Sequence, residues 1–362
     1  MLKVKTIRLK DMVSKAIKGA SNNKILPLTG MLAIELKDNI LTLTTTDFSN
    51  YLEIRSSKID GEDFYVVVQA EMFHKLISKL STEYVTLELK DNVLTVKSNG
   101  QYKLELPVDE NGKLVKFPEY HTKIDSPAYS IKLATLKTLL TTNKASIAQD
   151  LTVPALTGYY ICPEGVWTSD SYTACKNKIT SLKETFMLPS QVVELINVIT
   201  DGDVNVYVGD TNVIFDTPDV MIYGKLLLEK DNFPIEAVTN YLGTTFNSSC
   251  KFNKDALLSI LDRLLLFVGP YDKNEVYLTF TNEGMFIESK QQTGKELIPY
   301  SESANFTSFT CCIDIELLKS QVQAQQEELI ELFYGNDSAI KLVSGPVTQI
   351  ISLSEDSRGV EV

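Results

Sequence analysis

The sequence predicts an α+β fold built from three similar domains of about 120 residues each. Three stretches, at 66–106, 186–226 and 310–353, each run as a strand, an amphipathic helix and further strands separated by turns. Hydrophobic residues at 44% and charged residues at 23% are ordinary for a folded, soluble chain. The repeated order of elements is therefore the first guide to the architecture.

Each repeat is also preceded by a predicted helix of its own. These helices lie in "LKDMVSKAIKGASN" from Leu9, "LATLKTLLTTNKASIA" from Leu133 and "FNKDALLSILDRLLLF" from Phe252. Their apolar residues recur at three- and four-residue spacing, which is typical of amphipathic helices. Alternating strands such as "NILTLTTTD" follow, with "KDN", "GDT" and "NEG" as turn signals. Each domain should thus pack two helices on one face of an antiparallel sheet.

Similar segments close the first two domains, "KFPEY" at 116–120 and "NFPIE" at 232–236. We therefore expect domains at 1–122, 123–246 and 247–362. Three such domains in a row suggest an arc, and an arc that pairs with a copy of itself closes into a ring.

The net charge of −12 argues against nucleic-acid binding unless the basic residues gather on one surface. The six predicted helices sum to +3, whereas the remainder of the chain sums to −15. A helical face of this kind would attract phosphates without reading bases. The residues expected to face DNA are Lys10, Lys15, Lys18, Lys75, Lys79, Lys137, Lys144, Arg263 and Lys319.

The sequence gives little support for an enzymatic activity. Cys162, Cys175 and Ser171 are candidate nucleophiles, but the two histidines, His74 and His121, belong to the first domain and offer no nearby base. The five cysteines form no CxxC pair, and no GxxxxGK[ST] phosphate loop occurs. The sequence therefore predicts a protein that is not an enzyme, with no metal and no cofactor.

The N-terminus lacks the apolar core of a signal peptide, and no run reaches the roughly 18 apolar residues of a membrane span. We expect a cytoplasmic protein with no membrane partner.

Several motifs, taken in order, resemble the beta sliding clamp of bacterial DNA polymerase III. The first domain has "LTLTTTDFSNYLEI", "VVVQAEMFHKLISKLS" and "KFPEY", and the second has "LTGYYI", "TSDSYTA", "MLPSQVVELINVI" and "NFP". The likeness covers essentially the whole chain and fades after Leu353. Each motif is short, and the specificity lies in their joint order.

The resemblance implies a head-to-tail homodimer in which six similar domains form a ring around duplex DNA. Such a ring has no catalytic activity. It tethers the replicative DNA polymerase by topology, is opened by a clamp loader, and binds other proteins that carry clamp-binding motifs. It also implies ring contacts between Tyr102 and Leu104 on an edge strand and Leu266 and Phe267 in the third domain. These four could equally be ordinary core or edge residues.

The resemblance further implies a pocket for partner peptides between the second and third domains. The residues carried over to it are Leu156, Gly158, Ser169, Ser171, Tyr172, Thr173, Ala174, Pro234, Val238, Ile350, Ile351, Ser352 and Leu353. Tyr172, Thr173 and Ala174 stand where the family usually has His-Arg-Leu, and "SLSEDSRGVEV" replaces its apolar C-terminal end. These departures suit a divergent member, such as one carried by a phage or plasmid. An alternative function is a clamp-like protein that competes for clamp-binding peptides without encircling DNA.

Overall fold

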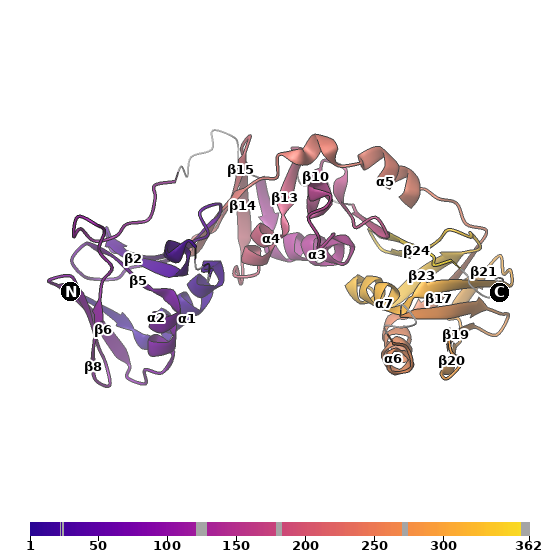
Figure 1. The fold of residues 1–362 in the computed structure, drawn as a ribbon, viewed down its shortest axis with the longest axis horizontal. Coiled ribbons are helices and arrows are strands. Elements are labelled where there is room, and N and C mark those ends of the chain that lie inside the picture. The colour runs from indigo at the N-terminus through magenta and orange to yellow at the C-terminus, as the bar shows by residue number, and fades with distance from the viewer. Residues whose placement is uncertain (22, 24, 121–128, 179–182, 270–273, 356–362) are drawn as a thin grey trace. The chain divides into compact units, whose positions relative to one another are not determined.

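The computed structural model describes residues 1–362 except 22, 24, 121–128, 179–182, 270–273 and 356–362 (Figure 1). The chain forms two compact units, each made of two segments. The N-terminal unit comprises Met1–Leu133 and Gln191–Leu226, and the C-terminal unit comprises Ala134–Ser190 and Leu227–Val362. All strand pairs between the described strands are antiparallel, and the predicted α+β class is confirmed.

The N-terminal unit contains two sheets and two packed helices. The four-stranded sheet has the order β1 (Leu2–Lys5), β6 (Tyr84–Lys90), β7 (Val93–Lys97), β8 (Gln101–Glu105). The eight-stranded sheet has the order β5 (Phe64–Gln69), β2 (Met31–Lys37), β3 (Ile40–Thr46), β4 (Tyr51–Ser57), β16 (Val220–Lys225), β15 (Asn212–Asp216), β14 (Asp203–Val208), β9 (Tyr129–Lys132). Helices α1 (Thr6–Ala16) and α2 (Ala70–Ser78) pack against each other (Figure 1).

The C-terminal unit repeats this plan with a larger sheet. Its nine-stranded sheet has the order β13 (Phe186–Pro189), β10 (Gly158–Cys162), β11 (Gly165–Ser169), β12 (Thr173–Asn177), β25 (Val347–Ser352), β24 (Ala339–Ser344), β23 (Leu329–Tyr334), β17 (Ser248–Asn253), β21 (Glu302–Ala304). Its four-stranded sheet has the order β20 (Lys295–Ile298), β19 (Met285–Ser289), β18 (Glu275–Phe280), β22 (Phe309–Asp314).

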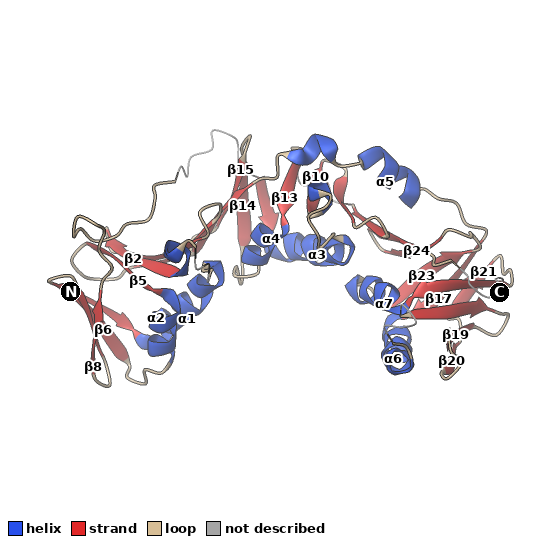
Figure 2. Ribbon diagram, viewed as in Figure 1, coloured by secondary structure: helices blue, strands red, loops and turns tan. Residues whose placement is uncertain are grey.

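The expected six helices are all present. The other four are α3 (Leu133–Asn143), α4 (Ser190–Ile196), α6 (Lys254–Leu264) and α7 (Ile315–Ala324). Side chains cap two of them: Asn253 accepts a hydrogen bond from the backbone N–H of Ala256, and Asp314 accepts from those of Glu316 and Leu317. Within the C-terminal unit, α6 and α7 lie side by side (Figure 2). None of the helices in the described ranges is long and apolar enough to cross a membrane.

A seventh helix, α5 (Ile235–Leu242), was not predicted. It begins directly after Pro234 and places Val238 and Leu242 in the core. Its signal is short: a proline ahead of the first turn and apolar residues at 235, 238 and 242. The segment "NFPIE" at 232–236, expected to close the second domain, thus runs into a helix.

The two compact units divide the predicted middle domain between them. Strands β9, β14, β15 and β16 continue the sheet that starts with β5, while β10 to β13 continue the sheet that holds β25. Pairing across the repeats, such as Leu52 with Ile222 and Ala174 with Ile350, makes each sheet continuous. The three-domain boundaries stay a prediction, and the one near residue 122 lies outside the described residues.

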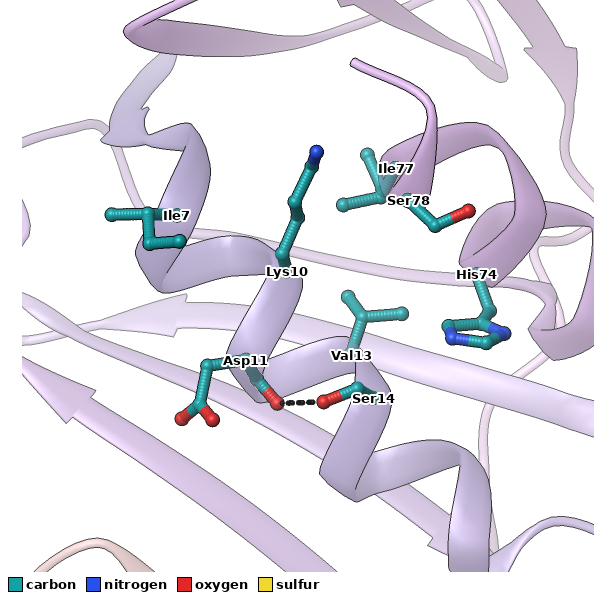
Figure 3. A pocket seen from close by; sticks show the side chains of 8 residues that line it. All are labelled: Ile7, Lys10, Asp11, Val13, Ser14, His74, Ile77 and Ser78. Atoms are coloured by element: carbon teal, nitrogen blue, oxygen red, sulfur yellow. Dashed lines mark hydrogen bonds between the residues drawn. The ribbon is translucent and has the colours of Figure 1, made fainter. Parts of the chain in front are cut away.

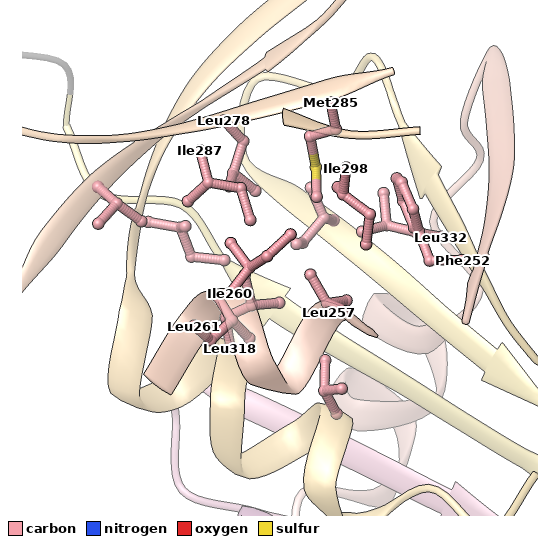
Figure 4. Close-up of a cluster of buried hydrophobic side chains, with 14 of the residues drawn as sticks. Phe252, Leu257, Ile260, Leu261, Leu278, Met285, Ile287, Ile298, Leu318 and Leu332 are labelled. Atoms are coloured by element: carbon pink, nitrogen blue, oxygen red, sulfur yellow. The ribbon is translucent and has the colours of Figure 1, made fainter. Parts of the chain in front are cut away.

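The largest core of the C-terminal unit lies between its two sheets and α6 and α7. Figure 4 shows Leu257 and Leu261 of α6 meeting Leu278, Met285 and the other labelled side chains. Ile260, Leu261 and Leu264 are buried at the helical spacing that the sequence predicted. The apolar stripe of α6 therefore serves as the inner face of this core.

Leu261→Ala should lower the free energy of unfolding of the C-terminal unit by about 2–5 kcal/mol, because it removes a fully buried side chain. Trp167, the single tryptophan, lies in this unit, so its fluorescence during urea denaturation reports the change. Ser259→Ala, on the exposed side of α6, is the matched control and should shift stability by less than about 0.5 kcal/mol. Equal effects of the two variants would contradict the core assignment.

Candidate peptide groove and nucleic-acid interface

Several residues of the predicted peptide pocket meet in one buried cluster of the C-terminal unit. Leu156, Ala174, Val238 and Ile350 pack together with Trp167 and neighbouring apolar residues. The antiparallel register places Ala174 of β12 opposite Ile350 of β25, and α5 packs on both strands. Segments that are far apart in the sequence therefore form one buried cluster, which we call the groove floor after the peptide pocket that the sequence predicts over it.

The predicted wall from β25 divides between two faces of the sheet. Ile350 belongs to the groove floor, whereas Ile351 is fully buried in the core that contains α6 and α7, and Leu353 packs against that same core. Successive strand residues point to opposite faces, so adjacent positions cannot line one wall. Ile351 and Leu353 therefore lie away from the groove floor, and only Ile350 and Ser352 from this strand remain on its side.

The turn at Asp170 to Thr173 forms the rim beside the groove floor. The Asp170 carboxylate accepts hydrogen bonds from the backbone N–H groups of Tyr172 (2.9 Å) and Thr173 (2.6 Å) and from the Thr173 hydroxyl (3.0 Å). The Ser169 hydroxyl donates to the Thr173 carbonyl at 2.8 Å, and Ser171 has a positive φ of 77°. These bonds fix the turn, in which Tyr172 is 65% exposed.

Tyr241 of α5 joins the same site, although the sequence analysis did not name it. Its hydroxyl lies 2.7 Å from the Ser352 hydroxyl, and the Ser352 N–H donates to the Tyr172 carbonyl at 2.8 Å. Burial raises the pKa of Tyr241, so the hydroxyl stays protonated at neutral pH. Recognising this residue from the sequence required α5, the helix that was missed.

Two further predicted residues have different surroundings. Pro234 is exposed at the start of α5, beside the buried Phe233. Gly158 is buried, and a Cβ atom there would lie 2.6 Å from the Leu227 side chain and 2.9 Å from the Leu188 carbonyl oxygen. Its role is therefore close packing within the sheet.

A pocket of about 560 Å³ lies between α1 and α2 of the N-terminal unit (Figure 3). Lys10 extends from α1 alongside Ile77 and Ser78 of α2, and His74 lies further along the same groove. The residues that line it are Ile7, Lys10, Asp11, Val13, Ser14, His74, Ile77 and Ser78. Lys10, predicted to face DNA, thus stands over a hollow between two helices.

Four of the nine predicted DNA-facing residues form ion pairs. The pairs are Lys15 with Asp11 at 2.8 Å, Lys75 with Glu71 at 2.5 Å, Arg263 with Glu296 at 2.5 Å and Lys319 with Asp262 at 2.5 Å. Exposed pairs of this kind contribute about 0–1 kcal/mol and exchange readily with other anions.

The other five predicted residues lie on α1 and α3 or directly after α1, α2 and α3. Lys10 and Lys18 belong to α1 and to η1 (Ile17–Gly19), and Lys79 directly follows α2. Within the described part of the chain, these three have no ion-pair partner. Lys137 lies on α3, and Lys144 begins the 3₁₀ turn η3 (Lys144–Ser146). All nine cations thus lie on helices or at their ends, and that they face DNA stays a prediction.

The four predicted ring-contact residues lie at two sheet edges. Tyr102, 37% exposed, and the buried Leu104 belong to β8, the edge strand of the four-stranded sheet in the N-terminal unit. Leu266 and Phe267, 81% and 48% exposed, form the 3₁₀ turn η6 (Leu265–Phe267) of the C-terminal unit. Phe267 lies close to Gly294, the residue before β20, which is also an edge strand and packs against α6.

The two cysteines among the candidate nucleophiles are buried, and each is held as a thiol. Burial, aided by a hydrogen bond from the thiol to the Glu164 carboxylate at 2.7 Å, raises the pKa of Cys162 to about 11. Burial likewise raises the pKa of Cys175. Among the residues that the structure describes, no group of three or more His, Cys, Asp or Glu side chains is arranged to hold a metal ion.

Residues 1–114 match the family model of the DNA polymerase III beta subunit, N-terminal domain. The beta sliding clamp of Bacillus subtilis is 22% identical over 298 residues, which are 75% of each chain. The crystal structure of the B. subtilis clamp matches with a TM-score of 0.86 at 18% identity, over 98% of this chain and 99% of that one. The beta subunit from Streptococcus pyogenes matches with a TM-score of 0.88 at 18% identity, over 98% and 100%.

In the folded protein at pH 7, the thiols should react with Ellman's reagent at least about a hundredfold more slowly than in urea, where all five are accessible. The raised pKa of Cys162 means that its rate should climb only as the pH approaches about 11. A native thiol that reacts at pH 7 as fast as in urea would contradict this assignment and reopen the case for a nucleophile.

Proposed function

We propose that this chain is a DNA sliding clamp of the bacterial DNA polymerase III beta clamp family; the family-model match over residues 1–114 and the fold shared with solved clamps support this proposal. In this proposal it encircles duplex DNA without sequence specificity and tethers the replicative DNA polymerase. The family consists of non-enzymatic processivity factors. The function therefore lies in binding surfaces and in ring closure, and its site of action is the cytoplasm.

One observation carries the proposal most directly: the fold agrees with solved beta clamps over 98% of the chain, with TM-scores up to 0.88. The placement of nine basic residues on helices or at their ends adds a physical reason. Such residues bind the phosphate backbone diffusely and release counterions, so the protein can hold a duplex and still slide.

Ring closure is proposed through the two exposed sheet edges. The β8 edge of one copy would pair with the β20 edge of the next, and Leu266 and Phe267 would be covered by the surface around Tyr102. Unpaired strand edges and exposed apolar side chains are the features that a head-to-tail contact buries.

The proposed partners other than DNA and a second copy are the polymerase, a clamp loader and other proteins with clamp-binding motifs. Their peptides would dock at the rim over the groove floor, beside Tyr172, Pro234, Tyr241 and Ser352. This surface offers an exposed aromatic ring, a proline and two hydroxyls, which suits a short segment with apolar anchors.

Leu266→Asp combined with Phe267→Asp should convert the dimer to a monomer, because the charges would be buried at both contacts of the ring. Sedimentation at micromolar concentration should then give about 40.5 kDa in place of twice that mass. Leu228→Asp, which alters another exposed apolar residue of the same unit, should leave the dimer intact. A wild-type chain that sediments strictly as a monomer would refute ring closure.

Changing Lys10, Lys18 and Lys79 together to Glu should weaken retention on nicked circular DNA by at least about tenfold. The slope of log affinity against log salt should fall by about 0.9 for each lost phosphate contact. The matched control reverses Lys90, Lys113 and Lys132, which are exposed outside the helices.

The same assay separates encirclement from the alternative of a clamp-like competitor that does not enclose DNA. After loading, a ring remains on nicked circles and slides off linear DNA of equal length. Equal retention on both substrates, or on neither, would exclude encirclement.

A further inference from the structure

We propose that Gln321 of α7 is a positioning residue for the peptide groove. It fixes the Asp170 to Thr173 turn to the part of the C-terminal unit that carries the basic residues Lys144 and Lys319. This inference rests on the proposed function, because it assigns the turn a role in holding a partner peptide.

The Gln321 side chain is fully buried and has a partner on each side of its amide. Its amide nitrogen donates to the Ala145 carbonyl at 2.8 Å and to the Thr173 hydroxyl at 3.3 Å. Its amide oxygen accepts from the Ser146 hydroxyl at 3.2 Å. Because a backbone carbonyl can only accept, the Ala145 contact fixes which end of the amide points toward the turn.

The hydrogen bonds continue from Gln321 into the rim of the groove. The Thr173 hydroxyl accepts from Gln321 and donates to the Asp170 carboxylate, which also binds the N–H groups of Tyr172 and Thr173. A hydroxyl has one proton, so its acceptance from Gln321 leaves that proton for Asp170. Gln321 thereby holds Thr173 in the orientation that closes the turn and presents Tyr172.

Both ends of the Gln321 amide contact η3, which begins at Lys144, and Lys319 lies two residues earlier on α7. The turn at the groove and the elements that carry these two cations thus share one buried side chain. Losing the Gln321 amide would leave the Thr173 hydroxyl with one partner fewer in a buried site, so the turn would lose its fixed geometry.

Gln325 provides a matched comparison on the same helix end. It is also fully buried, and its amide nitrogen donates to the side-chain oxygen of Gln349 on β25. No hydrogen bond links Gln325 to the turn within the described part of the chain. Replacing either glutamine by leucine removes a buried amide, but only the change at Gln321 removes a bond to the rim.

The test measures binding of a fluorescein-labelled peptide that carries the clamp-binding motif of a bacterial DNA polymerase III, by fluorescence polarisation. Gln321→Leu should weaken binding about fivefold or more, whereas Gln325→Leu should bind within about twofold of wild type. Urea denaturation followed by Trp167 fluorescence should show comparable destabilisation of the two, because each loses a buried amide.

Thr173 gives a second arm that does not depend on the folding of the glutamine variants. Thr173→Val should reproduce the weakened binding, and Thr173→Ser, which keeps the hydroxyl, should restore it. The double variant with Gln321→Leu should bind no more weakly than the worse single variant, because both remove the same link.

The outcomes separate the two proposals. A wild-type chain that binds no such peptide overturns the peptide groove itself and this inference with it. If wild type binds, then unchanged affinity in Gln321→Leu, equal loss in Gln325→Leu or equal affinities in the two Thr173 variants overturns the role of Gln321 alone.

Discussion

Main-chain pairing between strands of different sequence repeats is the constraint on which the rest of the structure depends. β4 pairs with β16 in one unit, and β12 pairs with β25 in the other, so that each large sheet draws strands from two repeats. Without these pairs, each repeat would leave edge strands with unsatisfied N–H and C=O groups. The pairing satisfies them and at the same time brings distant residues together.

Side chains reinforce the first of these seams. Tyr51 stacks on Tyr120 with 3.8 Å between ring centroids, and the Tyr120 hydroxyl donates to Glu53. Arg55 reaches across to Asp216 at 2.5 Å. Burial raises the pKa of Glu53, with the Tyr120 hydrogen bond and Arg55 acting against that rise. The segment that includes "KFPEY" therefore lies on the sheet that joins two repeats. Its contacts help to hold these two repeats together.

The sequence predicted those features whose pattern lies within a short stretch of the chain. Helical spacing predicted α6 and its buried leucines, and it also predicted which basic residues lie on helices. Both patterns lie within about a dozen neighbouring residues. Ile351 was assigned to the same pocket as Ile350 because a motif match carries over adjacent residues together. In a strand, adjacent side chains point to opposite faces of the sheet. Gln321 and Tyr241 carried no local signal, since their partners lie 111 or more residues away in the chain.

The polar stretch from Ser169 to Ala174 suggests a catalytic site in the sequence, but in the structure its side chains hold a turn in place. One oxygen of the Asp170 carboxylate accepts three hydrogen bonds from its own turn, so this side chain holds the turn together. Cys175, in the strand that follows the turn, is buried and stays a thiol. Ser171 and Tyr172 of this turn are exposed, while Ala174 lies buried in the cluster that α5 covers. The polar groups of this stretch form the hydrogen bonds that hold the turn. A turn that is already ordered loses little conformational entropy when a partner binds, so this arrangement favours binding over catalysis.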